Sequence, residues 1–139
     1  MIEFSRDNFY KYEPDAISIL LIDKNAALSG EAMKQLNYRQ PDIYDALKQR
    51  LLKLGDKVGL GSIVKVNKYY FIVCRENYRR SWDKNIFLHS WKVLTTKVAN
   101  KKFIIDIEDY EEMSKILQEN QFDASIKICN HCAFGDDWE

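Results

Sequence analysis

Short runs of apolar and β-branched residues recur along the chain and predict strands. They lie at 2–5, 16–22, 62–66, 69–75, 102–106 and 125–129. The run AISILLI at 16–22 is apolar almost throughout, which is typical of a central strand buried on both faces. Asn67-Lys68 between two of the runs predicts a tight hairpin.

Between these strands, apolar residues repeat every three or four positions and predict helices. Residues 41–54 begin with Pro41, a favoured first helical residue, and Gly55 follows as a natural C-cap. A second helix is predicted from Ser81, as N-cap, to about Ala99.

Two shorter helices complete the pattern. Residues 30–36 form one, and the capping-box-like pair Asp109 and Glu112 begins the other. The order strand, strand, helix, helix, strand, strand, helix, strand, helix, strand predicts a three-layer α/β/α sandwich around a mixed, mostly parallel sheet. We expect one domain over residues 1–139, with 130–139 as a tail.

Composition narrows the possible functions. Lys+Arg and Asp+Glu number 21 each, so the net charge is zero, and a protein that binds nucleic acid through its overall charge is disfavoured. No apolar run is long enough for a membrane helix, and the first residues do not form an export signal. We therefore expect a cytoplasmic protein that does not bind membranes. Its three cysteines fit free thiols in a reducing compartment.

The strongest local pattern is a basic and aromatic cluster where a strand gives way to a helix. It consists of Arg75, Tyr78, Arg79, Arg80, Trp82 and Lys84. Arginine forks and a helix N-terminus both suit phosphate, so a ligand or partner is expected here. The alternative is a solvated loop that Glu76 and Asp83 partly neutralise.

Metal and catalytic sites are less well supported. Cys129, His131 and Cys132 have zinc-ligand spacing, but a second ligand pair is missing. Cys74, inside the run FIVC, is expected to be a small buried hydrophobe rather than a nucleophile activated by His89. We expect no metal, no cofactor and no catalytic residues, although another kind of enzyme could use Cys74, His89 or Asp106.

The N-terminal pattern I-E-F-x-x-D-N-F, followed by Asp15-Ala16-Ile17 and an apolar strand, resembles the opening of macrodomains, which are ADP-ribose-binding α/β sandwiches. The resemblance extends over nearly the whole chain. It is greatest to the compact macrodomains that remove ADP-ribose from protein or DNA ends. Small relatives with few glycines are often encoded by bacteriophages, so the resemblance also implies a phage accessory protein.

The resemblance implies a site and also shows where this chain departs from it. Asp15 would accept a hydrogen bond from the adenine amino group, and two glycine-rich loops would hold the phosphates. The first loop is represented by Ser29-Gly30-Glu31-Ala32-Met33, with one glycine, and no glycine lies between Gly61 and Gly135. Arg75 stands at the position of the family's nucleophilic lysine, and a guanidinium cannot attack.

Together these features predict a protein that binds ADP-ribose or a related nucleotide without hydrolysing it. The expected ligand residues are Asp15, Ser29, Gly30, Arg75, Arg79 and Arg80. The alternative is a protein-interaction module that uses Tyr78, Trp82 and Lys84. Exposed aromatic residues such as Trp82 and Trp138 would also permit a homo-oligomer.

Overall fold

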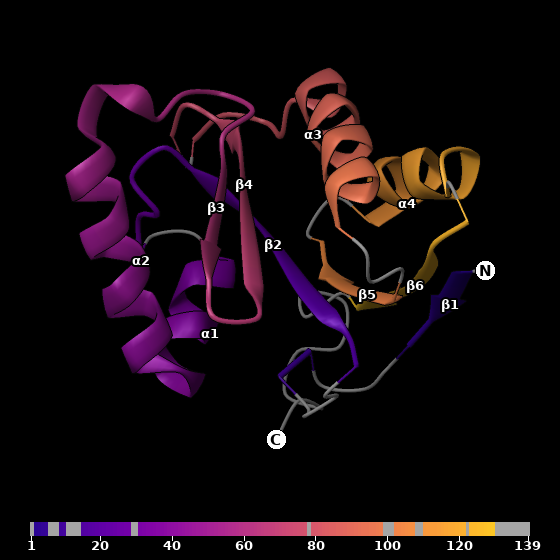
Figure 1. The fold of residues 1–139 in the computed structure, drawn as a ribbon, viewed down its shortest axis with the longest axis horizontal. Coiled ribbons are helices and arrows are strands. Elements are labelled where there is room, and N and C mark those ends of the chain that lie inside the picture. Colours follow the sequence, from indigo (N-terminus) through magenta and orange to yellow (C-terminus); the bar gives the residue numbers. More distant parts are fainter. Residues whose placement is uncertain are drawn as a thin grey trace.

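The computed structural model describes residues 2–5, 9–10, 15–28, 31–77, 79–98, 102–107, 110–121 and 123–129. The predicted strands and helices are present in the predicted order (Figure 1). They are β1 (Ile2–Phe4), β2 (Ile17–Asp23), α1 (Glu31–Arg39), α2 (Pro41–Leu54), β3 (Ile63–Val66), β4 (Tyr69–Arg75), α3 (Lys84–Lys97), β5 (Lys102–Asp106), α4 (Tyr110–Glu119) and β6 (Ser125–Cys129). A short 3-10 turn, η1 (Gly55–Lys57), follows α2.

The strands form one six-stranded sheet in the order β1-β6-β5-β2-β4-β3. Neighbouring strands in that order are parallel, except that β3 and β4 form an antiparallel hairpin. Asn67 at the tip of this hairpin adopts a positive φ of 58°, as the predicted tight turn requires. Because the other strands are parallel, the carboxyl ends of β1, β6, β5, β2 and β4 all lie at one edge of the sheet, hereafter the carboxyl edge.

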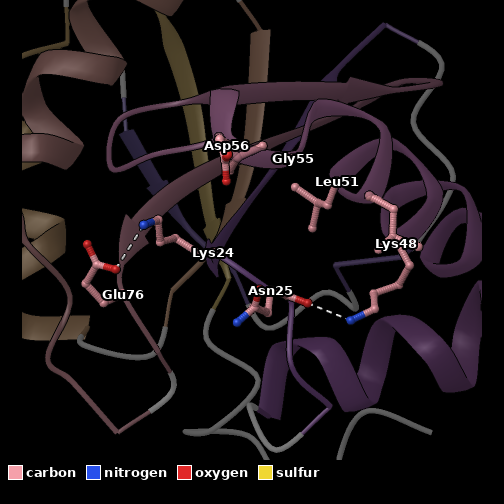
Figure 2. A pocket seen from close by; sticks show the side chains of 9 residues that line it. Lys24, Asn25, Lys48, Leu51, Gly55, Asp56 and Glu76 are labelled. Carbon is pink, nitrogen blue, oxygen red and sulfur yellow. Dashed lines mark hydrogen bonds and ion pairs between the residues drawn. The ribbon is translucent and has the colours of Figure 1, made fainter.

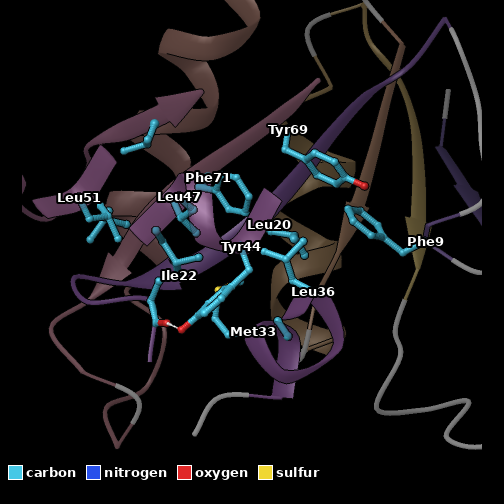
Figure 3. Close-up of a cluster of buried hydrophobic side chains, with 14 of the residues drawn as sticks. Phe9, Leu20, Ile22, Met33, Leu36, Tyr44, Leu47, Leu51, Tyr69 and Phe71 are labelled. Carbon is cyan, nitrogen blue, oxygen red and sulfur yellow. Dashed lines mark hydrogen bonds between the residues drawn. The ribbon is translucent and has the colours of Figure 1, made fainter. Parts of the chain in front are cut away.

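Helices cover both faces of the sheet, which confirms the three-layer sandwich. The pair α1 and α2 packs on one face and the pair α3 and α4 on the other (Figure 1). Side chains of β2 alternate between the two layers: Leu20 and Ile22 join the α1–α2 core (Figure 3), whereas Ile19 and Leu21 join the α3–α4 core. The central strand is therefore buried on both faces, as its apolar run predicts.

The boundaries of α2 follow the predicted capping residues. Pro41 occupies the start of the helix, where its missing N–H has no helical partner to lose. Gly55 ends the helix with a φ of 52°, a conformation that glycine adopts without steric cost. Leu47 and Leu51 are buried against the sheet, so the apolar repeat marks the inner face of the helix.

The N-cap of α3 differs from the prediction. Asp83 caps the helix in place of Ser81, and its Oδ1 accepts the Ile86 N–H at 3.0 Å. The Asp83 N–H donates to the Cys74 carbonyl at 2.8 Å, which holds the chain extended up to Asp83 and delays the helix start. The helix ends at Lys97, before Ala99. For α4, the expected cap Asp109 lies outside the described residues.

Replacing Asp83 by Ala should lower the free energy of unfolding by ~1 kcal/mol, because the Ile86 N–H loses its capping acceptor. Urea denaturation measures the change. Ser81→Ala is the matched control, since Ser81 is exposed and does not cap the helix, and it should alter stability by less than ~0.5 kcal/mol. Equal losses in the two variants would contradict the assignment of the cap.

Candidate ligand site at the carboxyl edge

Two loops meet at the carboxyl edge because they follow neighbouring parallel strands. One continues from β2 over residues 24–28, and the other, described over residues 76–77 and 79–83, lies between β4 and α3. At the ends of the two strands, Asp23 stands opposite Arg75, after an irregularity in the register at Ile22. In open α/β sheets the carboxyl ends of the strands form the usual ligand crevice, so a ligand site is expected at this edge.

Side chains, rather than glycines, shape the loop that follows β2. Asp23 is only 3% exposed, and its Oδ1 accepts the Ala27 N–H at 2.9 Å. Ala26 adopts a φ of 49°, which is unusual for a residue other than glycine. Its carbonyl accepts a buried hydrogen bond of 2.8 Å from the Tyr44 hydroxyl, which Figure 3 shows between α2 and the loop.

A second side chain from the same face of α2 holds the loop as well. Lys48 Nζ donates to the Asn25 carbonyl at 2.7 Å (Figure 2). Tyr44 and Lys48 are four residues apart and therefore lie on one helical face. Burial, with further contributions from Asp23 and Asp45, raises the pKa of Tyr44, so the phenol stays protonated and able to donate.

Arg75 closes the base of the loop that follows β4. Its guanidinium lies over the Trp82 ring at 3.6 Å from the ring centroid, and its Nη1 donates to the Arg80 carbonyl at 3.2 Å. The ring itself is 7% exposed and packs in the α3–α4 core. Trp82 was expected to contact a partner; in the structure its indole is covered by the core and by Arg75.

The other residues of the basic cluster are placed differently. Arg79 and Arg80 are exposed on the loop, where their backbone N–H groups donate to Asn77. Lys84 forms an ion pair with Glu112 of α4. Tyr78 lies outside the described residues. The expected partner surface consists of Tyr78, Trp82 and Lys84. Of the two that the structure describes, Trp82 is buried and Lys84 is paired with Glu112.

A cavity of about 570 Å³ opens beside the two loops, against the end of α2 (Figure 2). Two lysines and two carboxylates contribute charge to its lining, and leucines and a valine supply apolar surface. The lining residues are Lys24, Asn25, Lys48, Leu51, Leu52, Gly55, Asp56, Val58 and Glu76. Lys24 Nζ lies 3.2 Å from Glu76 Oε2, so an ion pair joins the β2 loop to the β4 loop.

Sequence reasoning missed the lysines of this cavity. Lys24 gives a usable signal, because it directly follows the buried run of β2 and so belongs to the carboxyl edge. Lys48 gives none, since it is one of several polar residues on α2 and reaches the site only through the packing of that helix.

Asp15 lies at the opposite edge of the sheet from Arg75. It is exposed and precedes the first residue of β2, whose seven residues at ~3.3 Å each separate the two edges by ~20 Å. The structure thus brings Arg75, Arg79 and Arg80 together on one loop and places Asp15 elsewhere. Ser29 and Gly30 lie outside the described residues.

Cys74 is a buried hydrophobe, as expected. It is fully covered in the α3–α4 core. Burial, with an added rise from Asp83 and an opposing contribution from Arg75, raises the pKa of the Cys74 thiol to about 12. The nucleophilic thiolate is therefore scarce at neutral pH. His89 is exposed on α3.

Asp106 is also buried, at 3% exposure. It pairs in register with Leu20, part-way along β2, and so lies inside the sheet rather than in the cavity. Burial, with Asp106 and Tyr69 as further causes and Arg39 opposing, raises the pKa of Tyr10. Asp106 lies on the α1–α2 face of the sheet, because Ile104, two residues earlier in β5, packs in the α1–α2 core.

Within the described residues, no three His, Cys, Asp or Glu side chains gather as a metal site would require. His131 and Cys132, two of the zinc-spaced residues, fall beyond the described part of the chain. Among the described helices, none is both long enough and apolar enough to cross a membrane.

No protein-family model and no curated protein matches the sequence. Solved structures do. The macrodomain of Thermus aquaticus DarG, at 12% identity, aligns with a TM-score of 0.70 over 93% of this chain and 97% of that chain. The macrodomain of Mycobacterium tuberculosis DarG, at 10% identity, aligns with a TM-score of 0.71 over 93% of this chain and 97% of that chain.

A third similar structure is Thermosipho africanus DarTG in complex with ADP-ribose. It is 8% identical, with a TM-score of 0.65 over 89% of this chain and 39% of that longer chain. With these neighbours, the strand order and the two helical layers establish that the chain has the macrodomain fold.

Tyr44→Phe should destabilise the protein by ~1–3 kcal/mol, because the buried Ala26 carbonyl loses its donor. Denaturant titration measures this loss. Tyr38→Phe is the control, because the Tyr38 side chain is 79% exposed, against 6% for Tyr44. The free energy of unfolding of this variant should change by close to zero. If both variants keep full stability, the hydroxyl does not hold the loop.

Proposed function

We propose that this chain binds ADP-ribose or a related nucleotide at the carboxyl edge and releases it unchanged. The observation that carries the proposal is the cavity beside the β2 and β4 loops, where Lys24 and Lys48 stand next to apolar surface. A nucleotide needs both features: cations for its phosphates and apolar contact for a ring or the ribose carbons. The fold adds support, since a similar structure was solved with ADP-ribose.

The phosphates would bind where the positive charge is accessible. Lys24 and Lys48 line the cavity, and Arg79 and Arg80 are exposed on the adjoining loop. Arg75 has a different role in this proposal, because its guanidinium is held between the Trp82 ring and the Arg80 carbonyl. It positions the loop that carries the other two arginines.

The chemistry of Arg75 and Cys74 supports the proposal that the ligand is bound without hydrolysis. Arg75 remains protonated and serves neither as a nucleophile nor as a base. The Cys74 thiol is buried with a pKa of about 12.

Isothermal titration calorimetry with ADP-ribose tests the proposal. The protein should give saturable heat, and chromatography of the mixture should return the ligand intact. Lys24→Ala should weaken binding by about tenfold, as expected for the loss of one charged contact of ~1.4 kcal/mol. Lys53→Ala is the matched control, because this lysine of α2 is exposed and does not line the cavity, and it should leave affinity unchanged.

Three results count against the proposal. Absence of heat at millimolar ADP-ribose refutes binding. Equal losses in Lys24→Ala and Lys53→Ala refute the location. Release of free ADP-ribose from a modified substrate refutes the claim that the chain binds without hydrolysis.

A further inference from the structure

The geometry points to Glu76 as an internal competitor for the ligand's anionic group. In this inference, which rests on the proposed function, the Glu76 carboxylate occupies the position at Lys24 that a phosphate takes when a nucleotide binds. Binding therefore requires the Lys24–Glu76 ion pair to open. Glu76 then sets how strongly the site prefers phosphorylated ligands over neutral ones.

The positions of the two side chains support this role. Lys24 comes from the loop after β2 and Glu76 from the loop after β4, and both line the cavity (Figure 2). Their charged atoms are 3.2 Å apart, so the carboxylate is at contact distance from the ammonium group. A phosphate oxygen that approaches Lys24 as closely must displace the carboxylate.

The charge balance of the cavity makes the displacement selective. Its lining carries two lysines, Lys24 and Lys48, and two carboxylates, Asp56 and Glu76, so the formal charges cancel. A neutral nucleoside can enter without opening the ion pair. A phosphorylated ligand gains Lys24 only after Glu76 has moved away, and it is repelled by the carboxylate until then.

Exposure indicates that the ion pair can open. The Lys24 and Glu76 side chains are 36% and 53% exposed. Ion pairs exposed to this extent are weak, since water and salt screen them. The pyrophosphate of ADP-ribose carries two negative charges, whereas the Glu76 carboxylate carries one. Lys48 has a different partner, because its ammonium group donates a hydrogen bond to the Asn25 carbonyl. Lys24 is thus the cavity lysine whose partner a ligand replaces.

Glu76→Gln tests the inference, because it removes the competing charge at constant shape. Calorimetry should show ADP-ribose binding tighter by about 2- to 5-fold, the range that an exposed ion pair is worth. Adenosine affinity should not change. The gain should shrink when the salt concentration rises from low to high, since both charges are in reach of solvent.

Asp56→Asn is the matched control. It removes one negative charge from the same cavity, but the carboxylate 3.2 Å from Lys24 is that of Glu76. Direct competition predicts a gain in Glu76→Gln that is clearly larger than in Asp56→Asn. Equal gains in both variants would reduce the effect to the general field of the cavity and overturn the inference.

The remaining outcomes separate this inference from the proposed function. If the unmodified protein binds ADP-ribose and Glu76→Gln binds it no more tightly, the inference fails and the proposed function stands. If neither protein binds any phosphorylated ligand, both fail. Circular dichroism of each variant confirms that the fold is intact before the affinities are compared.

Discussion

Burial of β2 on both faces is the constraint on which the arrangement of the molecule depends. The strand pairs with β4 on one side and β5 on the other, and its side chains enter both helical layers. Burying each Leu or Ile fully contributes ~1.5–3 kcal/mol to the free energy of folding. A shift in register would expose many of these side chains and lose that stabilisation. Because the register is fixed in this way, the loops after β2 and β4 must meet at one edge.

The loop after β2 shows how this macrodomain fold is built with few glycines. The chain has five glycines in 139 residues. Where the backbone takes a left-handed turn it uses Ala26, and the Tyr44 hydroxyl and the Asp23 carboxylate hold the loop in place. Side chains from β2 and α2 thus stabilise a conformation that glycine would adopt unaided. The resulting edge presents lysines and arginines, and the proposed ligand contacts are made through side chains.

Periodicity was enough to predict the layers, because the alternation of β2 and the apolar repeat of α2 both report burial directly. Periodicity did not predict the features that a tertiary contact determines, namely the start of α3 and the burial of Trp82. Ser81 and Asp83 are both good N-caps, and the Asp83–Cys74 backbone hydrogen bond selects the second. Trp82 was expected to contact a partner because arginine and tryptophan are enriched at interfaces, whereas in the structure Arg75 stacks on the ring and the ring packs in the core.

The candidate site was harder to predict than the fold. Family resemblance suggested Asp15, but the structure places it at the amino end of β2. Proximity along the chain correctly grouped Arg79 and Arg80 on one exposed loop. The cavity lysines come from two separate elements, and nothing in their local sequence shows that α2 brings Lys48 beside the β2 loop.

Mapping ADP-ribose binding by amide chemical shifts in NMR tests the position of the site most directly, because it locates the ligand on the sheet. If the ligand binds at the carboxyl edge, the shifts should be concentrated in residues 23–28 and 75–80, with little change near Asp15 and the Asn67-Lys68 turn. Shifts centred on Asp15 and that turn would contradict the assignment of the ligand to the carboxyl edge.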